Sequence, residues 1–193
     1  MSKIWFTSDL HFGHSNIIKY CGRPYETVEE MNDGLILQWN SMVSEHDIIY
    51  HLGDFCLTHS EDKIVNWVNQ LKGNIRFITV NHDTRLRGID SLWVKSYFEK
   101  TFTVNGQKQK VVMFHFPIER WHGQQWGSWH LHGHCHGSLD GINTSLGIKR
   151  LDVGWDGIAG RTFREFANSL ISLEELDEIF KYRTAINYHH GDY

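Results

Sequence analysis

Five short strand-like runs in this sequence are each followed closely by side chains that bind metal ions. The runs occupy residues 4–6, 48–50, 75–80, 111–114 and 129–132, and their β-branched and aromatic side chains are typical of buried strands. Ligands collect at the carboxyl ends of strands in α/β sheets. The spacing therefore predicts a metal centre at one sheet edge, with the ligands Asp9, His11, Asp54, Asn81, His115, His134 and His136.

The chemistry of these side chains favours divalent ions that activate water. Carboxylate, amide and imidazole groups suit Mn²⁺, Fe²⁺, Zn²⁺ and Ni²⁺, of which we expect Mn²⁺. Two such ions about 3.5–4 Å apart clamp an in-line displacement at phosphorus. Alternation along a strand puts Asp9 and His11 on one side of their segment, and His134 and His136 likewise. We therefore expect two divalent metal ions.

Helices are predicted between the first strand-like runs. Residues 27–30 (Thr-Val-Glu-Glu) have the form of a capping box, and apolar residues then recur at steps of three and four as far as Met42. A second helix is predicted over residues 60–71, with Gly73 as its stop signal. A third begins at Ser172, where a capping box recurs.

The order of the elements predicts an α/β fold. Strands and helices interleave near the amino-terminal end, and strands dominate afterwards. Residues 100–116 form a predicted hairpin that turns at Asn105 and Gly106. We therefore expect a layered core whose second half is more antiparallel.

The composition limits the class of protein. With 193 residues, 40% of them apolar and 22% charged, the chain is predicted to be a single domain over residues 1–193. The net charge of −4 argues against strong binding to duplex nucleic acid. It permits a small phosphorylated substrate, such as a nucleotide. The 14 histidines are a high number, which a metal site explains.

We expect a cytoplasmic protein without a membrane partner. The opening Met-Ser-Lys-Ile-Trp-Phe lacks the features of a signal peptide, and no segment approaches the ~20 apolar residues of a membrane span. The three cysteines, Cys21, Cys56 and Cys135, are an odd number without close spacing, which argues against a disulfide framework. The sequence leaves the oligomeric state open.

Taken in order, the motifs resemble those of the calcineurin-like metallophosphoesterases. That family has Asp-x-His, Gly-Asp, Gly-Asn-His-Asp/Glu, a lone His and Gly-His-x-His, and matching residues run here from Ile4 to His136. The opening Asp-Leu-His-Phe-Gly-His is similar to the small stand-alone bacterial and phage members. The resemblance implies a four-layer α/β/β/α sandwich, with two facing mixed sheets flanked by helices and a dinuclear site at the strand ends.

The resemblance also implies a role for each ligand. One metal ion would be held by Asp9, His11 and His136. The other would be held by Asn81, His115 and His134, and Asp54 would bridge the two.

The implied reaction is hydrolysis of a P–O bond by a hydroxide that bridges the two ions. His82 would face the substrate phosphate, where it stabilises charge or protonates the leaving alkoxide. No covalent enzyme intermediate is expected.

The sequence departs from the family pattern at three positions. Val80 stands where the family has glycine before Asn81, and a β-branched residue is strained if that position needs a positive φ angle. Leu57 and Thr58 replace the Asp and Arg found in related protein phosphatases. The missing Arg favours a less charged phosphodiester over a phosphoprotein.

Other polar and aromatic residues could contact the substrate or serve only the structure. Candidates for substrate contact are His14, Arg23, Arg120 and His122. The tryptophans between residues 121 and 129 are expected to pack in the core or in loops, with stacking on a nucleobase as the alternative. We expect His130 and His132 to be sheet residues rather than ligands, and His51 to be a strand residue or a hydrogen-bond partner of a ligand.

The resulting hypothesis is a hydrolase, a dinuclear metallophosphoesterase that cleaves a phosphodiester, with nucleotide-like or cyclic nucleotide substrates as plausible examples. One alternative is a phosphomonoesterase acting on a small molecule or nucleotide. A second is a catalytically weak metal-binding scaffold for protein contacts. A third, a mononuclear zinc module over residues 129–136, leaves Asp9, His11, Asp54 and Asn81 unexplained.

Overall fold

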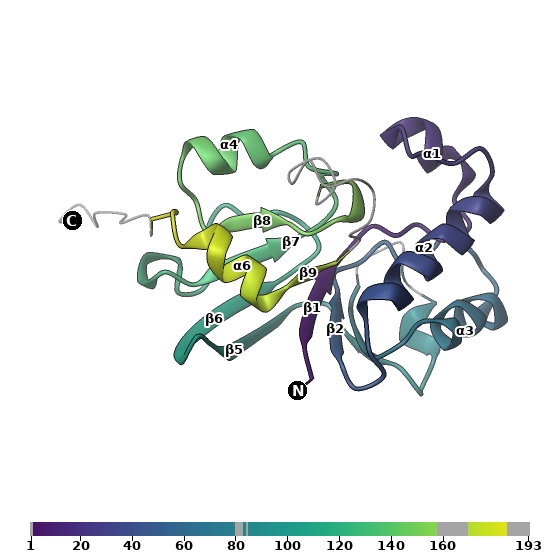
Figure 1. The fold of residues 1–193 in the computed structure, drawn as a ribbon, viewed down its shortest axis with the longest axis horizontal. Coiled ribbons are helices and arrows are strands. Elements are labelled where there is room, and N and C mark those ends of the chain that lie inside the picture. Colours follow the sequence, from purple (N-terminus) through teal and green to yellow (C-terminus); the bar gives the residue numbers. More distant parts are fainter. Residues whose placement is uncertain (1, 80–82, 84, 158–169, 185–193) are drawn as a thin grey trace.

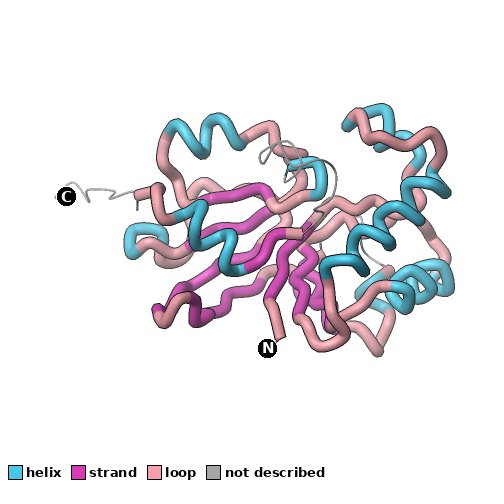
Figure 2. The backbone as a smooth tube through the Cα atoms, viewed as in Figure 1, coloured by secondary structure: helices cyan, strands magenta, loops and turns pink. Residues whose placement is uncertain are grey.

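Two mixed β-sheets and several helices form the structure, a computed structural model that describes residues 2–79, 83, 85–157 and 170–184 (Figure 1). The first sheet has the strand order β4-β3-β2-β1-β9, and the second has the order β5-β6-β7-β8. Figure 2 shows the strands gathered in the middle of the molecule. The expected α/β class is confirmed.

The first sheet is parallel except at one edge. Its strands are β1 (Ile4–Thr7), β2 (Ile48–His51), β3 (Asn74–Ile78), β4 (Trp93–Lys95) and β9 (Ile171–Ser172). The strands β1 to β4 pair in parallel, and β9 pairs antiparallel with β1. The carboxyl ends of β1, β2 and β3 therefore point to one edge.

The second sheet is less antiparallel than the sequence predicts. Its strands are β5 (Phe98–Val104), β6 (Gln107–Met113), β7 (Trp129–His132) and β8 (Arg150–Asp152). The strands β5 and β6 form the predicted hairpin, whose turn has φ angles of 49° at Asn105 and 79° at Gly106. However, β6, β7 and β8 pair in parallel. The antiparallel expectation fails there because long connections, rather than tight turns, return the chain to its starting edge.

The three predicted helices are confirmed. They are α2 (Val28–Met42), α3 (Glu61–Gln70) and α6 (Leu173–Phe180). Thr27 and Ser172 close the expected capping boxes, and Ser60 accepts a hydrogen bond from Lys63 at the start of α3. Four shorter helices were not predicted from the sequence: α1 (Ser15–Cys21), α4 (Asp140–Ser145), η2 (Leu86–Gly88) and η3 (Gln124–Trp126).

Alternation along the first sheet divides the core in two. Trp5, Ile49 and Phe77 join a cluster with the buried faces of α2 and α3. Their neighbours Phe6 and Tyr50 join a second cluster that contains residues of both sheets and of α6. Figure 1 shows the same arrangement, with α2 and α3 on one side of β1 and β2 and the second sheet on the other. The central strands are thus fixed on both faces.

Membrane insertion through a helix finds no support in the described residues. None of the helices in these ranges combines the length and the apolar character that a bilayer span requires.

Candidate metal centre

The residues that follow β1, β2, β6 and β7 meet at one place. The backbone N–H of Asp9 donates to the carbonyl of Gly53 at 3.0 Å, and that of His11 donates to Asp54 at 3.0 Å. The backbone N–H of His134 donates to the Asp9 carboxylate, with 3.1 Å to each oxygen. These bonds join the ligand-bearing loops of the two sheets, so residues separated by more than a hundred positions become neighbours.

The described ligands fall into two groups whose potential ligand atoms lie within 4.8 Å of one another. The groups are Asp9, His11 and His136, and Asp54, His115 and His134. The first group has the same residues as one set implied by the family resemblance, and the second contains His115 and His134 of the other set.

Asp54 lies between the two groups. Its Oδ2 is 3.8 Å from Nε2 of His11 and 3.6 Å from Nε2 of His115. Oδ1 of Asp9 is 3.9 Å from Nε2 of His11 and 4.0 Å from Nε2 of His136. These separations are too long for hydrogen bonds. They are slightly wider than the roughly 3 Å between adjacent ligand atoms on a small divalent ion, so such an ion fits after a small contraction.

Unsatisfied ring nitrogens support the same assignment. The Nε2 atoms of His11 and His115 are buried and have no hydrogen-bond partner among the described residues. Nδ1 of His115 lies 2.7 Å from the carbonyl of Leu52, so in the neutral imidazole that a metal ion binds, Nδ1 is the donor and Nε2 carries the lone pair. A buried imidazole with its lone pair directed at a carboxylate cluster is suited to bind a metal ion.

The pKa shifts of Asp9 and His115 indicate that a bound cation would stabilise the site. Burial, partly offset by His115, raises the pKa of Asp9 to about 7. Burial lowers the pKa of His115, but Asp54 and Asp9 outweigh burial and raise this pKa to about 9. Two carboxylates side by side in a buried site ionise fully when a divalent ion compensates them. The residues present therefore fit a dinuclear metal centre.

The backbone at the ligands is strained. Positive φ angles at residues other than glycine occur, among the described residues, at the hairpin turn Asn105 and at Asp9, His11, Asp54, His134 and His136. This left-handed conformation costs roughly 1–2 kcal/mol for a residue with a side chain. Such cost concentrated at one site indicates that function, rather than stability, selects these side chains.

This strain leads to a test at His134, whose φ is 69°. His134→Gly and His134→Ala both remove the imidazole, but glycine accepts the left-handed backbone without penalty. We expect the glycine variant to be more stable than the alanine variant by about 1 kcal/mol. Urea unfolding of both metal-free proteins measures the difference. An alanine variant of equal or higher stability would show that His134 is not strained.

Two glycines of the motifs are required by close packing. A Cβ at Gly53 would lie 2.5 Å from Nδ1 of His115, and a Cβ at Gly133 would clash with Oδ2 of Asp9. These contacts are shorter than side chains tolerate. The glycines of Gly-Asp and Gly-His-x-His therefore let ligands from different strands approach each other.

Two buried aspartates support the ligand loops. Asp83 accepts hydrogen bonds from the backbone N–H groups of Asp54 at 2.8 Å and Phe55 at 3.1 Å. Asp152 accepts those of Gly137 at 2.9 Å and Gly154 at 2.8 Å. Asp152 was not predicted from the sequence, although it ends β8 and so has the strand-end position on which the predicted ligands were chosen.

Three residues singled out from the sequence lie outside the described residues. They are Val80, Asn81 and His82. The described contacts of the Asp83 carboxylate are with the Asp54 loop.

Of the four candidates for substrate contact, the structure places only His14 at the centre. Nδ1 of His14 is 3.5 Å from Nδ1 of His11, and both residues line a pocket of about 150 Å³. Arg23 is instead 4% exposed, and its guanidinium donates to Asp156 and to the backbone carbonyls of Leu10 and Asp9. The Arg23 side chain therefore lies under the metal centre and bonds to protein groups rather than facing a substrate.

The other two candidates lie elsewhere. Nδ1 of His122 is 2.7 Å from Oε2 of Glu99 on β5, and Arg120 is exposed in the loop between β6 and η3. The neighbouring Trp121 is buried against Ser128, and Trp129 belongs to the core, as expected. Trp126 is exposed.

His130 and His132 are buried sheet residues, as expected. Nε2 of His130 accepts from the backbone N–H of Ile118, and Nδ1 of His132 lies 2.8 Å from the Gly133 carbonyl. His51 is also fully buried, between Phe55 and Phe77, and neither of its ring nitrogens has a hydrogen-bond partner among the described residues.

His51 predicts a specific dependence of stability on pH. Burial lowers its pKa to about 3, so between pH 6.5 and 3 the unfolded chain binds a proton that the folded protein does not. This term therefore destabilises the fold as the pH falls. When the pH is lowered from 7.5 to 5, we expect the free energy of unfolding to fall by about 2 kcal/mol less in His51→Leu than in the wild type. Unfolding of both metal-free proteins at the two pH values tests this, and parallel losses would contradict it.

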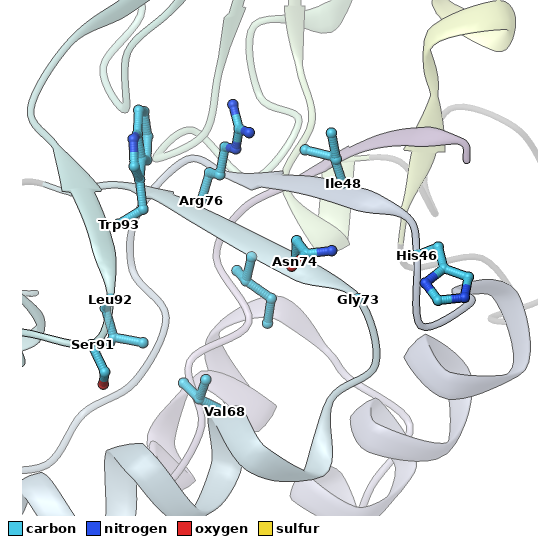
Figure 3. A pocket seen from close by; sticks show the side chains of 10 residues that line it. His46, Ile48, Val68, Gly73, Asn74, Arg76, Ser91, Leu92 and Trp93 are labelled. Carbon is cyan, nitrogen blue, oxygen red and sulfur yellow. The ribbon is translucent and has the colours of Figure 1, made fainter. Parts of the chain in front are cut away.

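A separate pocket of about 540 Å³ lies at the opposite ends of the strands (Figure 3). It is lined by the starts of β2 and β3, including Ile48 and Asn74, and by Arg76 and Trp93. It contains no predicted ligand. This pocket is therefore separate from the predicted ligands, which follow the carboxyl ends of the strands.

The comparisons with known proteins give relatives without a stated activity. No family model matches the chain. A Methanocaldococcus jannaschii protein, the uncharacterized protein MJ1445, is 38% identical over 137 residues, which are 70% of each chain. The Gene 66 proteins of the mycobacterium phages L5 and D29 are 27% and 26% identical, over 81% of this chain and 87% and 89% of theirs.

A solved structure has the same fold. The crystal structure of AQ665, a protein of unknown function from Aquifex aeolicus, aligns with a TM-score of 0.68 and 19% identity. The alignment covers 93% of this chain and all of that chain. At this identity the likeness concerns the fold alone.

Proposed function

The chain belongs to the same protein family as MJ1445 of Methanocaldococcus jannaschii, and from its metal centre we propose that it is a metal-dependent phosphodiesterase. We further propose that it is a calcineurin-like metallophosphoesterase. The order of the ligand motifs along the sequence supports this assignment. The meeting of two sheets in one core, with helices against the first, supports the four-layer α/β/β/α sandwich of that superfamily.

One observation carries the proposal. Two separate groups of ligands, each with one aspartate and two histidines, share the space around the Asp54 carboxylate. A mononuclear zinc module does not need the second group, and a scaffold does not need strained ligands. When bound, two divalent ions neutralise the charge on a phosphate ester and activate water at phosphorus.

The residues of the chain position the reactants. Asp54 would hold both ions through its carboxylate, and the buried imidazoles of His11 and His115 would each hold one of them through Nε2. The buried strands behind them keep bulk water from that side of the site. The family resemblance implies that His82 would face the substrate, where its imidazole would protonate the leaving alkoxide.

The rim of the pocket favours a diester over a monoester. The described lining residues are His11, His14, Asp54, Cys56 and Leu57. These residues include no lysine or arginine to bind the second charge of a phosphomonoester, and the exposed Leu57 offers apolar contact instead. A small phosphodiester with an apolar or aromatic substituent, such as a nucleotide, suits this rim.

The proposal is tested by hydrolysis of two chromogenic esters on stripped protein reloaded with Mn²⁺. We expect bis-p-nitrophenyl phosphate to be cleaved faster than p-nitrophenyl phosphate, and chelation to abolish both activities. Faster cleavage of the monoester would favour a phosphomonoesterase. Failure to cleave either ester with two ions bound would favour the metal-binding scaffold.

A further inference from the structure

A carboxylate outside the ligand motifs contacts the ligand His136 from behind. Oδ2 of Asp156 lies 2.6 Å from Nδ1 of His136, whereas Nε2 of the same ring faces Asp9 at 4.0 Å. Asp156 follows β8 in the chain and is 20 residues from His136. The imidazole is therefore held between a carboxylate on one side and the predicted ion position on the other.

Arg23 fixes Asp156 in turn. Its Nε donates to Oδ1 of Asp156 at 3.0 Å, and its Nη2 donates to Oδ2 at 2.8 Å. This two-point contact leaves the carboxylate little rotational freedom. The guanidinium also donates to the carbonyls of Leu10 at 2.8 Å and Asp9 at 2.6 Å and stacks on Trp155. Arg23 thereby ties Asp156 to the loop that carries the first two ligands.

We propose that Asp156, held by Arg23, is a positioning residue that keeps the Nδ1 proton of His136 on its far side and directs Nε2 at the first metal ion. The inference rests on the proposed function, because it assigns a role to a neighbour of that metal centre. A carboxylate that accepts the distal N–H fixes the tautomer and the orientation of a ligating imidazole and raises its basicity.

A different role for this cluster is less consistent with the contacts. Sγ of Cys21 is 3.3 Å from Nδ1 of His136, so Cys21, His136 and Asp156 also group as potential ligands. The charged guanidinium of Arg23 is bonded to the same carboxylate, which opposes a cation there. Nδ1 of His136 is in addition already paired with Asp156.

The test compares Asp156→Asn and Asp156→Ala with the exposed-residue control Asp33→Asn. Titration of metal-free protein with Mn²⁺ should show two sites in the wild type and the control. Asp156→Ala should lower the Mn²⁺ affinity of one of the two sites by roughly 10- to 100-fold. Asp156→Asn, which keeps a neutral hydrogen-bond acceptor, should lower this affinity less. If Asp156→Ala leaves Arg23 unpaired and fails to fold, the double variant Arg23→Met, Asp156→Leu removes both charges.

A second measurement does not depend on metal or turnover. Ring ¹⁵N NMR of metal-free protein should show His136 with its proton on Nδ1 in the wild type and a mixture of tautomers in Asp156→Ala. Two Mn²⁺ sites of wild-type affinity together with an unchanged tautomer in Asp156→Ala would overturn the inference and leave the phosphodiesterase proposal intact. A wild type that binds no Mn²⁺ but shows the Nδ1 proton would instead defeat the proposed function.

Discussion

Asp54→Asn is expected to abolish metal-dependent hydrolysis, with a loss on the order of 10³-fold or more in kcat/KM. The carboxylate lies 3.8 Å from Nε2 of His11 and 3.6 Å from Nε2 of His115, so it is close to a ring nitrogen of each ligand group. Removing the charge of this carboxylate should weaken the binding of both ions at once. Asparagine keeps the size of the side chain, so the fold itself should survive.

Metal content distinguishes this result from simple unfolding. Elemental analysis should show fewer than two Mn²⁺ per chain in Asp54→Asn, and circular dichroism should match the wild type. Asp62→Asn, an exposed aspartate on α3, provides the control and should keep activity and metal. If Asp54→Asn retained two ions, the bridging role would be wrong.

His82→Ala should lower turnover of the diester by roughly 10²–10⁴-fold while both ions stay bound. The expectation comes from the sequence, in which His82 follows the predicted ligand Asn81 in Asn-His-Asp. An imidazole beside the metal centre that is not a ligand is suited to protonate a departing alkoxide.

Comparing substrates with different leaving groups tests whether His82 is the general acid. If His82 is the general acid, the deficit should shrink for substrates whose leaving group is a good one, such as p-nitrophenol, and grow for alkyl leaving groups. His59→Ala, at a histidine outside the proposed site, is the control. A loss of metal from His82→Ala would reassign the residue as a ligand.

Local patterns in the sequence predicted most of the regular elements. The capping boxes at Thr27 and Ser172 start helices because their side chains satisfy backbone groups only a few residues away. Asn105-Gly106 sets the hairpin because both residues tolerate positive φ. The parallel pairing of β6, β7 and β8 was not predicted, because strand direction there depends on where long connections return.

By itself, the sequence determined which side chains form the candidate centre, since each described ligand follows a strand whose apolar pattern is local. Only the tertiary structure decided how these ligands meet. It showed Asp54 between the two groups, the left-handed backbone at five ligands, and Arg23 beneath the site rather than facing a substrate. Asp156 could not be identified from the sequence, because its contact with His136 depends on how the loops that follow β7 and β8 pack against each other.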